Sequence, residues 1–190
     1  MKKYIKGVTP SVALINPKYP HNVGAVIRAA SCFDIEQVWF TGTRISEALE
    51  GKTRIPREER MKGYAHVDLV NCDYFFDRFK NVVPVAIEIL PNTELLTTFV
   101  HPKNALYVFG PEDGGIPQVI RQHCHKFVAI PSRHCLNLGA AVNVVLAHRF
   151  MQLQLQGEKP MMHIRDLLME ERGIPAADES DRIPEFELIK

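Results

Sequence analysis

Short apolar runs alternate with segments of helical periodicity, and this alternation constrains the fold more than any other feature of the chain. The apolar runs predict strands at 11–16, 37–42, 66–70, 82–89, 104–110 and 126–131. The segments between and after them predict helices at 22–33, 72–79, 117–123 and about 137–155. Because the strand runs are continuously apolar, both of their faces should be buried. The sequence therefore predicts an α/β fold, a mostly parallel sheet with helices on both faces.

The composition changes towards the carboxyl end. Residues 158–190 are rich in charge and contain prolines, whereas the preceding residues carry the alternating pattern. We therefore expect one folded domain at 1–157. The segment 158–190 should add a helix at about 162–172 and then a loosely ordered tail.

Several functional classes are disfavoured by simple features of the chain. No apolar run is long enough to cross a membrane, and the first residues, MKKYIKGVTP, lack the apolar core of a secretory signal. We therefore expect a cytoplasmic protein without membrane contact. The four cysteines form no CxxC pair, which favours reduced thiols and no metal site.

One basic cluster stands out in a chain whose formal net charge is only +1. It lies at 51–63, and it either faces solvent or contacts the phosphates of a nucleic acid. Its cationic residues are Lys52, Arg54, Arg57, Arg60 and Lys62.

Polar residues and glycines gather directly after three of the predicted strands. The carboxyl ends of parallel strands meet at one edge of a sheet, where ligands bind. Taken singly, these residues have ordinary explanations as turns and helix caps, with Asn22, Glu112, Asp113 and Asn137 as possible caps. In chain order they are Asn16, Asn22, Arg28, Gly110, Glu112, Asp113, Cys135, Asn137 and Gly139.

Taken together, the segments HNVGAVIRAA, FGPEDGGIP and IPSRHCLNLGAAV resemble the SPOUT class of RNA methyltransferases. The resemblance is to the TrmH-like branch, which methylates ribose 2′-hydroxyls, and above all to its small single-domain members, which include tRNA wobble-ribose methylases. It spans roughly residues 10 to 155. It implies a deep C-terminal trefoil knot, a homodimer whose active site is shared between protomers, and S-adenosylmethionine as methyl donor, with no metal.

The resemblance also assigns roles to individual residues. Arg28 would activate the ribose hydroxyl, by orienting it or by acting as base, and polar residues would organise the site: Asn16, Glu112 and Asn137. The donor would be held by Ile87, Gly110, Ile130, Cys135 and Leu136. RNA would lie on the core surface and on the basic cluster, at Arg54, Arg57, Arg60 and Lys62.

The expected activity is thus methylation of a ribose 2′-hydroxyl of RNA, with tRNA favoured and rRNA as the alternative. Two other interpretations stay open. One is a non-catalytic RNA-binding module of the same kind. The other is a thiol hydrolase that uses Cys135 with His134 or His125 as base.

Overall fold

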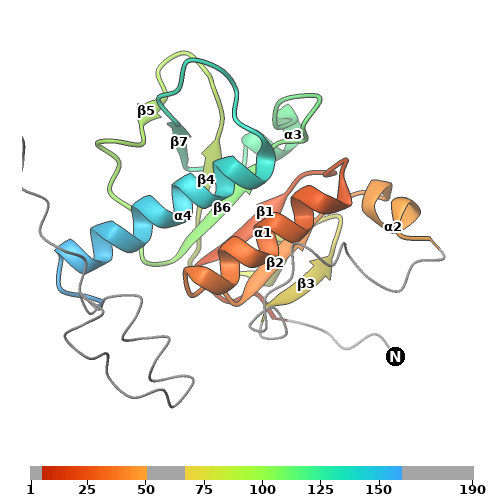
Figure 1. The fold of residues 1–190 in the computed structure, drawn as a ribbon, viewed down its shortest axis with the longest axis horizontal. Helices are drawn as coiled ribbons and strands as arrows, with labels where there is room; N and C mark the ends of the chain where they lie inside the picture. Colours follow the sequence, from red (N-terminus) through yellow and green to blue (C-terminus); the bar gives the residue numbers. More distant parts are fainter. Residues whose placement is uncertain (1–5, 51–66, 160–190) are drawn as a thin grey trace, which may run out of the picture. The chain divides into compact units, whose positions relative to one another are not determined.

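The computed structural model describes residues 6–50 and 67–159. Within them, seven strands form one sheet in the order β3-β2-β1-β6-β4-β7-β5, and every pairing is parallel (Figure 1). The elements are β1 (Ser11–Leu14), α1 (Pro20–Cys32), β2 (Gln37–Phe40), α2 (Arg44–Ala48), β3 (Asp68–Asn71), the 3-10 helix η3 (Phe76–Arg78), β4 (Val83–Ile87), β5 (Glu94–Leu95), β6 (Ala105–Phe109), α3 (Gln118–Arg121), β7 (Lys126–Ala129) and α4 (Leu138–Leu155).

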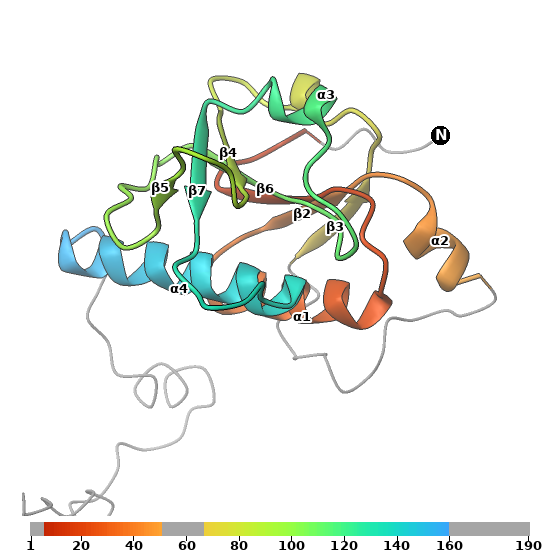
Figure 2. The same ribbon diagram turned by 90° about the horizontal axis from the view of Figure 1, so that it is seen from above.

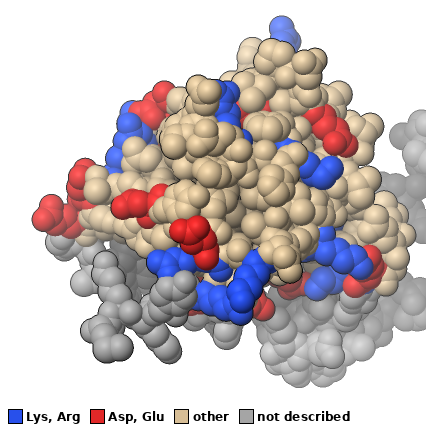
Figure 3. Space-filling view, turned by 180° about the vertical axis from the view of Figure 1, so that it is seen from behind, with Lys and Arg blue, Asp and Glu red and all other residues tan. Residues whose placement is uncertain are grey.

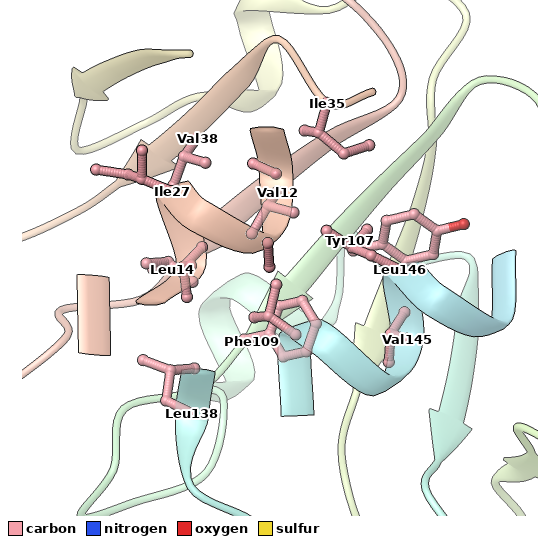
Figure 4. Packing of buried hydrophobic residues seen from close by; sticks show 14 of the residues in the cluster. Val12, Leu14, Ile27, Ile35, Val38, Tyr107, Phe109, Leu138, Val145 and Leu146 are labelled. Carbon is pink, nitrogen blue, oxygen red and sulfur yellow. The ribbon is translucent and has the colours of Figure 1, made fainter. Parts of the chain in front are cut away.

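Helical segments cover both faces of the sheet. The helices α1 and α4 lie side by side on one face, and η3 and α3 lie on the other (Figure 2). In β1 and the residue that follows it, Val12 and Leu14 belong to the apolar cluster of the first face, whereas Ala13 and Ile15 belong to the cluster of the second. The labelled side chains in Figure 4 come from the first cluster, and they include Leu14, Phe109, Leu138, Val145 and Leu146. Burial of both faces explains why the strand runs are continuously apolar.

The predicted α/β fold with a parallel sheet is confirmed, and the main strands and helices lie where they were expected. The helix expected at 72–79 is wrong: only the single turn η3 forms there. Phe75 and Phe79 both reach the core, as a helical spacing demands, but one turn suffices to place them. The short elements α2 and β5 were not anticipated.

Two expectations about the chain's organisation stay predictions. One is the trefoil knot, and the other is the domain division after residue 157. The chain separates into compact units Met1–Gln152 and Leu153–Lys190. The helix expected at about 162–172 and the tail lie outside the described residues. Across the described residues, no helix combines the length and apolarity that a membrane span needs.

A buried polar cluster ties the later turns of α4 to the sheet. Nδ1 of His101 lies 2.6 Å from the hydroxyl oxygen of Tyr107, and Nε2 of His101 lies 2.8 Å from Nδ1 of His148. The Gln152 side chain accepts a hydrogen bond from the backbone N–H of His101 and donates one to the carbonyl of Phe99. The segment after β5 is thereby bonded to α4.

The protonation states in this cluster follow from its burial. Desolvation, reinforced by the charges of His148 and Arg149, lowers the pKa of His101 to about 3. Burial also raises the pKa of Tyr107, so its hydroxyl keeps the proton. A neutral His101 has one ring acceptor and one ring donor, which suits a bond from Tyr107 and a bond to His148.

Acidification should therefore destabilise the fold through His101. The folded state excludes a proton that the unfolded state binds, so this contribution is complete above the ordinary histidine pKa of 6.5 and is lost as the pH falls towards 3. At about pH 5 the loss from this residue should be about 1–2 kcal/mol of unfolding free energy. Urea unfolding at neutral pH and at about pH 5 measures it.

The comparison needs two variants. His101→Gln should lose less stability than the wild type between the two pH values. His134→Gln, at an exposed loop position, should lose as much as the wild type. Equal losses in all three proteins would refute the assignment.

Candidate functional site

A pocket opens where the carboxyl ends of β4, β6 and β7 meet the start of α4. These three strands are neighbours in the sheet, and β1 lies on the other side of β6. The pocket walls are mostly apolar, with two carboxylates and a free thiol, and no Lys or Arg of residues 6–50 and 67–159 lines them. The lining residues are Ile87, Glu88, Ile89, Phe109, Gly110, Pro111, Glu112, Gly114, Ile130, Ser132, Cys135, Leu136, Leu138 and Ala141.

Three loops around the pocket are joined through the side chain of Asn22, which is only 2% exposed. Its Nδ2 donates to Glu112 of the β6 loop at 2.6 Å, and its Oδ1 accepts from Nδ2 of Asn137 at 2.9 Å. The Oδ1 of Asn137 in turn accepts from the backbone N–H groups of Gly139 and Ala140, so Asn137 caps α4 as expected. We call Asn22, Glu112 and Asn137 the loop-joining triad.

The carboxylate of Glu112 also fixes the turn that leads into α1. It accepts hydrogen bonds from the backbone N–H groups of Lys18, at 2.7 Å, and Tyr19, at 3.3 Å. Burial raises the pKa of Glu112, but the hydrogen bonds from Asn22, Lys18 and Tyr19 outweigh it and hold the pKa below its usual value. Glu112 is therefore an ionised wall of the pocket near neutral pH.

Neither acidic residue of the β6 loop caps α3, as one interpretation of the sequence had suggested. Glu112 reaches the α1 turn instead, and Asp113 forms ion pairs with Lys18 at 3.4 Å and with Arg44 at 2.8 Å. The N-cap position of α3 is Pro117, and no side chain caps that helix. The expectation was wrong because both carboxylates bind residues of other loops at this edge of the sheet, not the backbone of the helix that follows them in the chain.

Two glycines are required by close approaches. A Cβ atom on Gly139 would come 2.8 Å from Cβ of Ala25, so Gly139 lets the start of α4 rest on α1. A Cβ atom on Gly110 would come 3.0 Å from the backbone N of Ile116, inside the turn that closes the pocket. Gly114, in the same turn, has room for a side chain.

All five residues expected to hold a donor line this one pocket: Ile87, Gly110, Ile130, Cys135 and Leu136. They come from the ends of β4, β6 and β7 and from the loop before α4. Their convergence is a fact of the fold, whereas their contact with a donor stays a prediction.

The residues expected to be catalytic are less closely gathered. Glu112 lines the pocket. Asn137 is outside the lining, but it donates a hydrogen bond to Asn22, which in turn binds Glu112. Arg28 is exposed on α1 and is absent from the pocket lining. Asn16 also lies outside the lining: its backbone N–H donates to Thr41 at 3.0 Å, and its side chain rests against Gly42. The roles of all four stay predictions.

Other expected residues have different outcomes. The RNA-binding candidates lie outside the described residues: Arg54, Arg57, Arg60 and Lys62. Cys135 is exposed, and within the described part of the chain no hydrogen bond joins it to His134 or His125, so the base that a thiol hydrolase needs is not in place. In residues 6–50 and 67–159, no cluster of three His, Cys, Asp or Glu side chains could hold a metal ion.

The sequence did not reveal what two of the site residues do. Asn22 was placed near the end of the first strand and interpreted as a helix cap, but α1 begins at Pro20 and Asn22 is a buried residue of its first turn. Its position on the same helical stripe as Val26 and Ala29 could have revealed a buried amide in need of partners. Glu88 directly follows β4, as Gly110 follows β6, and accepts hydrogen bonds from the N–H groups of Ile116 and Ile89.

Comparisons with known proteins place this geometry in context. The family model described as the SpoU rRNA Methylase family matches residues 10–147. A search of curated proteins gives no match. Among solved structures, the chain is similar to the TrmH/SpoU tRNA modifying enzyme of A. aeolicus, with 19% identity, a TM-score of 0.64, and coverage of 86% of this chain and 85% of that one.

Two further structures are similar. One is the SpoU methyltransferase AviRb from Streptomyces viridochromogenes in complex with the cofactor AdoMet, with 18% identity, a TM-score of 0.58, and coverage of 78% of this chain and 62% of that one. The other comes from work on the 2-OH methylation of C/U34 on tRNA, with 22% identity, a TM-score of 0.61, and coverage of 76% and 90%. At these identities the similarity shows the fold.

Removing the Asn22 side chain should weaken the whole fold. Asn22→Ala deletes two hydrogen bonds at a buried position and leaves polar atoms of Glu112 and Asn137 unpaired, which should cost about 1–3 kcal/mol of unfolding free energy. Urea unfolding measures the loss. Asn71→Ala is the control, because that exposed amide makes one long bond, of 3.3 Å, to Ser46 and should cost under about 0.5 kcal/mol. Similar losses in both variants would show that the triad does not stabilise the fold.

Proposed function

The chain belongs to the SpoU rRNA methylase family, and from this premise we propose that it transfers a methyl group from S-adenosylmethionine to a ribose 2′-hydroxyl of RNA. The observation that carries the proposal is the pocket at the ends of β4, β6 and β7, which gathers five residues that the family resemblance assigns to the donor. The AdoMet complex of the Streptomyces viridochromogenes relative supports the same donor.

The chemistry of the pocket fits that donor. Ile87, Ile130 and Leu136 offer apolar contact to an adenine ring, and the loop backbone near Gly110 offers hydrogen bonds. Glu88 and Glu112 place two carboxylates in the walls, and none of the described Lys or Arg residues lies in the lining, which suits a ligand that carries a positive sulfonium and an ammonium group. When bound, the donor would supply an already activated methyl group, so the chain has to position the acceptor rather than create a reactive species.

We propose that Arg28 orients the acceptor hydroxyl and a neighbouring phosphate. A guanidinium is planar and donates several hydrogen bonds in fixed directions. Arg28 is exposed, and within the described residues no hydrogen bond or ion pair occupies its guanidinium, so it is available to RNA. We therefore propose orientation rather than proton abstraction, because a guanidinium offers several hydrogen-bond donors and no acceptor. The hydroxyl proton would pass to solvent.

A homodimer would explain why Arg28 stands apart from the pocket of its own protomer. We propose that the Arg28 of one protomer serves the pocket of the other, as the family resemblance implies. The outer side of α4 supports an interface, because apolar Val144 and Met151 are exposed there, at 38% and 53%. They lie seven residues apart and so share one stripe of the helix.

For the RNA substrate we propose tRNA, with rRNA as the alternative. The tRNA proposal is supported by the resemblance to small family members and by two of the similar structures. The rRNA alternative is supported by the similarity to an rRNA methyltransferase from Sinorhizobium meliloti. Mapping 2′-O-methyl groups in cellular RNA with and without the protein decides between them, and a map without any change would contradict both. A non-catalytic RNA-binding module would bind RNA but leave this map unchanged.

The cytoplasmic location and the contact of Arg54, Arg57, Arg60 and Lys62 with RNA stay proposals too.

The donor proposal predicts different effects of one alanine inside the pocket and one outside it. Gly110→Ala places a Cβ atom against the backbone of Ile116 and should weaken binding of S-adenosylmethionine at least about tenfold, since the pocket wall must shift. Val119→Ala should change the affinity less than about threefold, because Val119 is 63% exposed on α3 and is absent from the pocket lining. Calorimetry without added metal measures both. Absence of binding by the wild type would refute the donor.

The shared-site proposal predicts complementation between two impaired variants, assayed at a donor concentration well below the dissociation constant of Gly110→Ala. Arg28→Lys should lower turnover by on the order of 10²-fold while donor affinity stays unchanged. Mixed and reassociated with Gly110→Ala, it should regain about a quarter of the wild-type activity, because half of the dimers are hybrid and each hybrid has one intact site. A mixture as inactive as its components would show that Arg28 acts within its own protomer, and a monomer by light scattering would exclude the dimer.

A further inference from the structure

On the face opposite to α1 and α4, charge alone does not mark out an RNA-binding surface of the described residues. Basic and acidic side chains are interspersed over the face opposite to α1 and α4, with uncharged areas between them (Figure 3). The turn between β1 and α1, beside the pocket, is different in kind, because it combines exposed aromatic rings with the cation of Lys18. We call Tyr19, His21 and Lys18 the entry platform, after its place at the start of α1.

The rings of the entry platform are already stacked. The ring centroids of Tyr19 and His21 lie 5.3 Å apart, and the ring planes differ by 22°. Tyr19 is 42% exposed and His21 is exposed as well. The Nζ atom of Lys18 lies 5.3 Å from the centroid of the Tyr19 ring, within the range of a cation–π contact. A third ring can extend an exposed, near-parallel aromatic pair by stacking on it.

The entry platform is held rigidly at the edge of the pocket. Glu112, which lines the pocket, accepts hydrogen bonds from the backbone N–H groups of both Lys18 and Tyr19. Pro17 precedes these residues and Pro20 follows them, and each proline fixes its own φ angle. A ligand ring that stacks there would therefore cost little ordering of the protein.

Cations lie beside the rings. Asp113 pairs with Lys18 at 3.4 Å and with Arg44 at 2.8 Å, and both cations stay substantially exposed, with 41% and 38% of their side chains accessible. Their exposed ends can therefore contact a phosphate that displaces one of the two ion pairs. The surface thus pairs exposed aromatic rings with exposed cations, which matches the base and the phosphate of a nucleotide.

We propose that the entry platform stacks an unpaired nucleobase of the RNA substrate next to the methylated ribose, while Lys18 and Arg44 contact its phosphates. This inference rests on the proposed function and names the form of RNA that the site takes: a single strand or a loop, not a continuous duplex. Proteins recognise such RNA by stacking splayed bases on aromatic side chains.

The test uses an oligouridylate of about 12 nucleotides with one central 2-aminopurine, and a duplex of the same length. The single strand should bind the wild type with quenching of the 2-aminopurine fluorescence. Tyr19→Ala should weaken binding at least about fivefold and reduce the quenching, and Tyr19→Trp should restore both. Tyr74→Ala is the matched control, because Tyr74 is similarly exposed, at 44%, but packs beside Phe76 and His123 and is absent from the pocket lining.

Salt dependence separates stacking from charge. Tyr19→Ala should leave the slope of log affinity against log salt unchanged, whereas Arg44→Gln should make it shallower by about 0.7, one phosphate contact. The proposal is overturned if Tyr19→Ala behaves like Tyr74→Ala, if the duplex binds as well as the single strand, or if Tyr19→Ala changes only the dimer mass in light scattering. Binding of the donor by the wild type, measured separately, shows whether such a failure concerns the platform alone or the proposed function as well.

Discussion

The buried amide of Asn22 is the contact on which the arrangement of the site depends. An amide hidden from water has to find partners, and both of its partners come from other loops: Glu112 and Asn137. The same bonds that satisfy Asn22 therefore fix the distances between the β1, β6 and β7 loops. Glu112 extends the network to the α1 turn, and Asn137 extends it to the first turn of α4. The pocket is thus preorganised by groups whose separation would leave buried polar atoms unpaired.

The general fold could be predicted from the sequence because a strand that is buried on both faces of the sheet is a continuous run of apolar residues. Every residue of β1, β2 and β6 is buried, and apolar side chains fill almost all of these positions. This pattern is missing where an element is only partly buried. β5 is two exposed residues, recognisable only through its pairing with β7, and the apolar spacing at Phe75 and Phe79 fits a long helix as well as a single turn.

The site was predictable to the extent that topology alone gathers it. Residues that follow neighbouring parallel strands meet at one edge of the sheet. A correct prediction of the parallel sheet therefore also predicts that Gly110 and Ile130 line the same pocket. Some contacts depend on how a helix is rotated about its axis or on a partner far away in the chain, and no local sequence pattern predicts them. Asn22 resembled a cap, and the direction of Arg28 depends on which side of α1 faces the sheet. Glu88 binds the backbone of the β6 loop, 28 residues away, by its side chain.

The separation along the chain of the triad residues has a consequence for the order of folding. Asn22 bonds to residues 90 and 115 positions later, so the pocket walls come from segments at opposite ends of the domain. Loops of that length close only after the central strands have paired, which makes the pocket a late product of a fold with high contact order. A nascent chain that has not yet released residue 137 from the ribosome lacks the wall formed by α4. The ability to hold a ligand in this pocket is therefore a property of the completed domain, and it reports that β7 and α4 are in place.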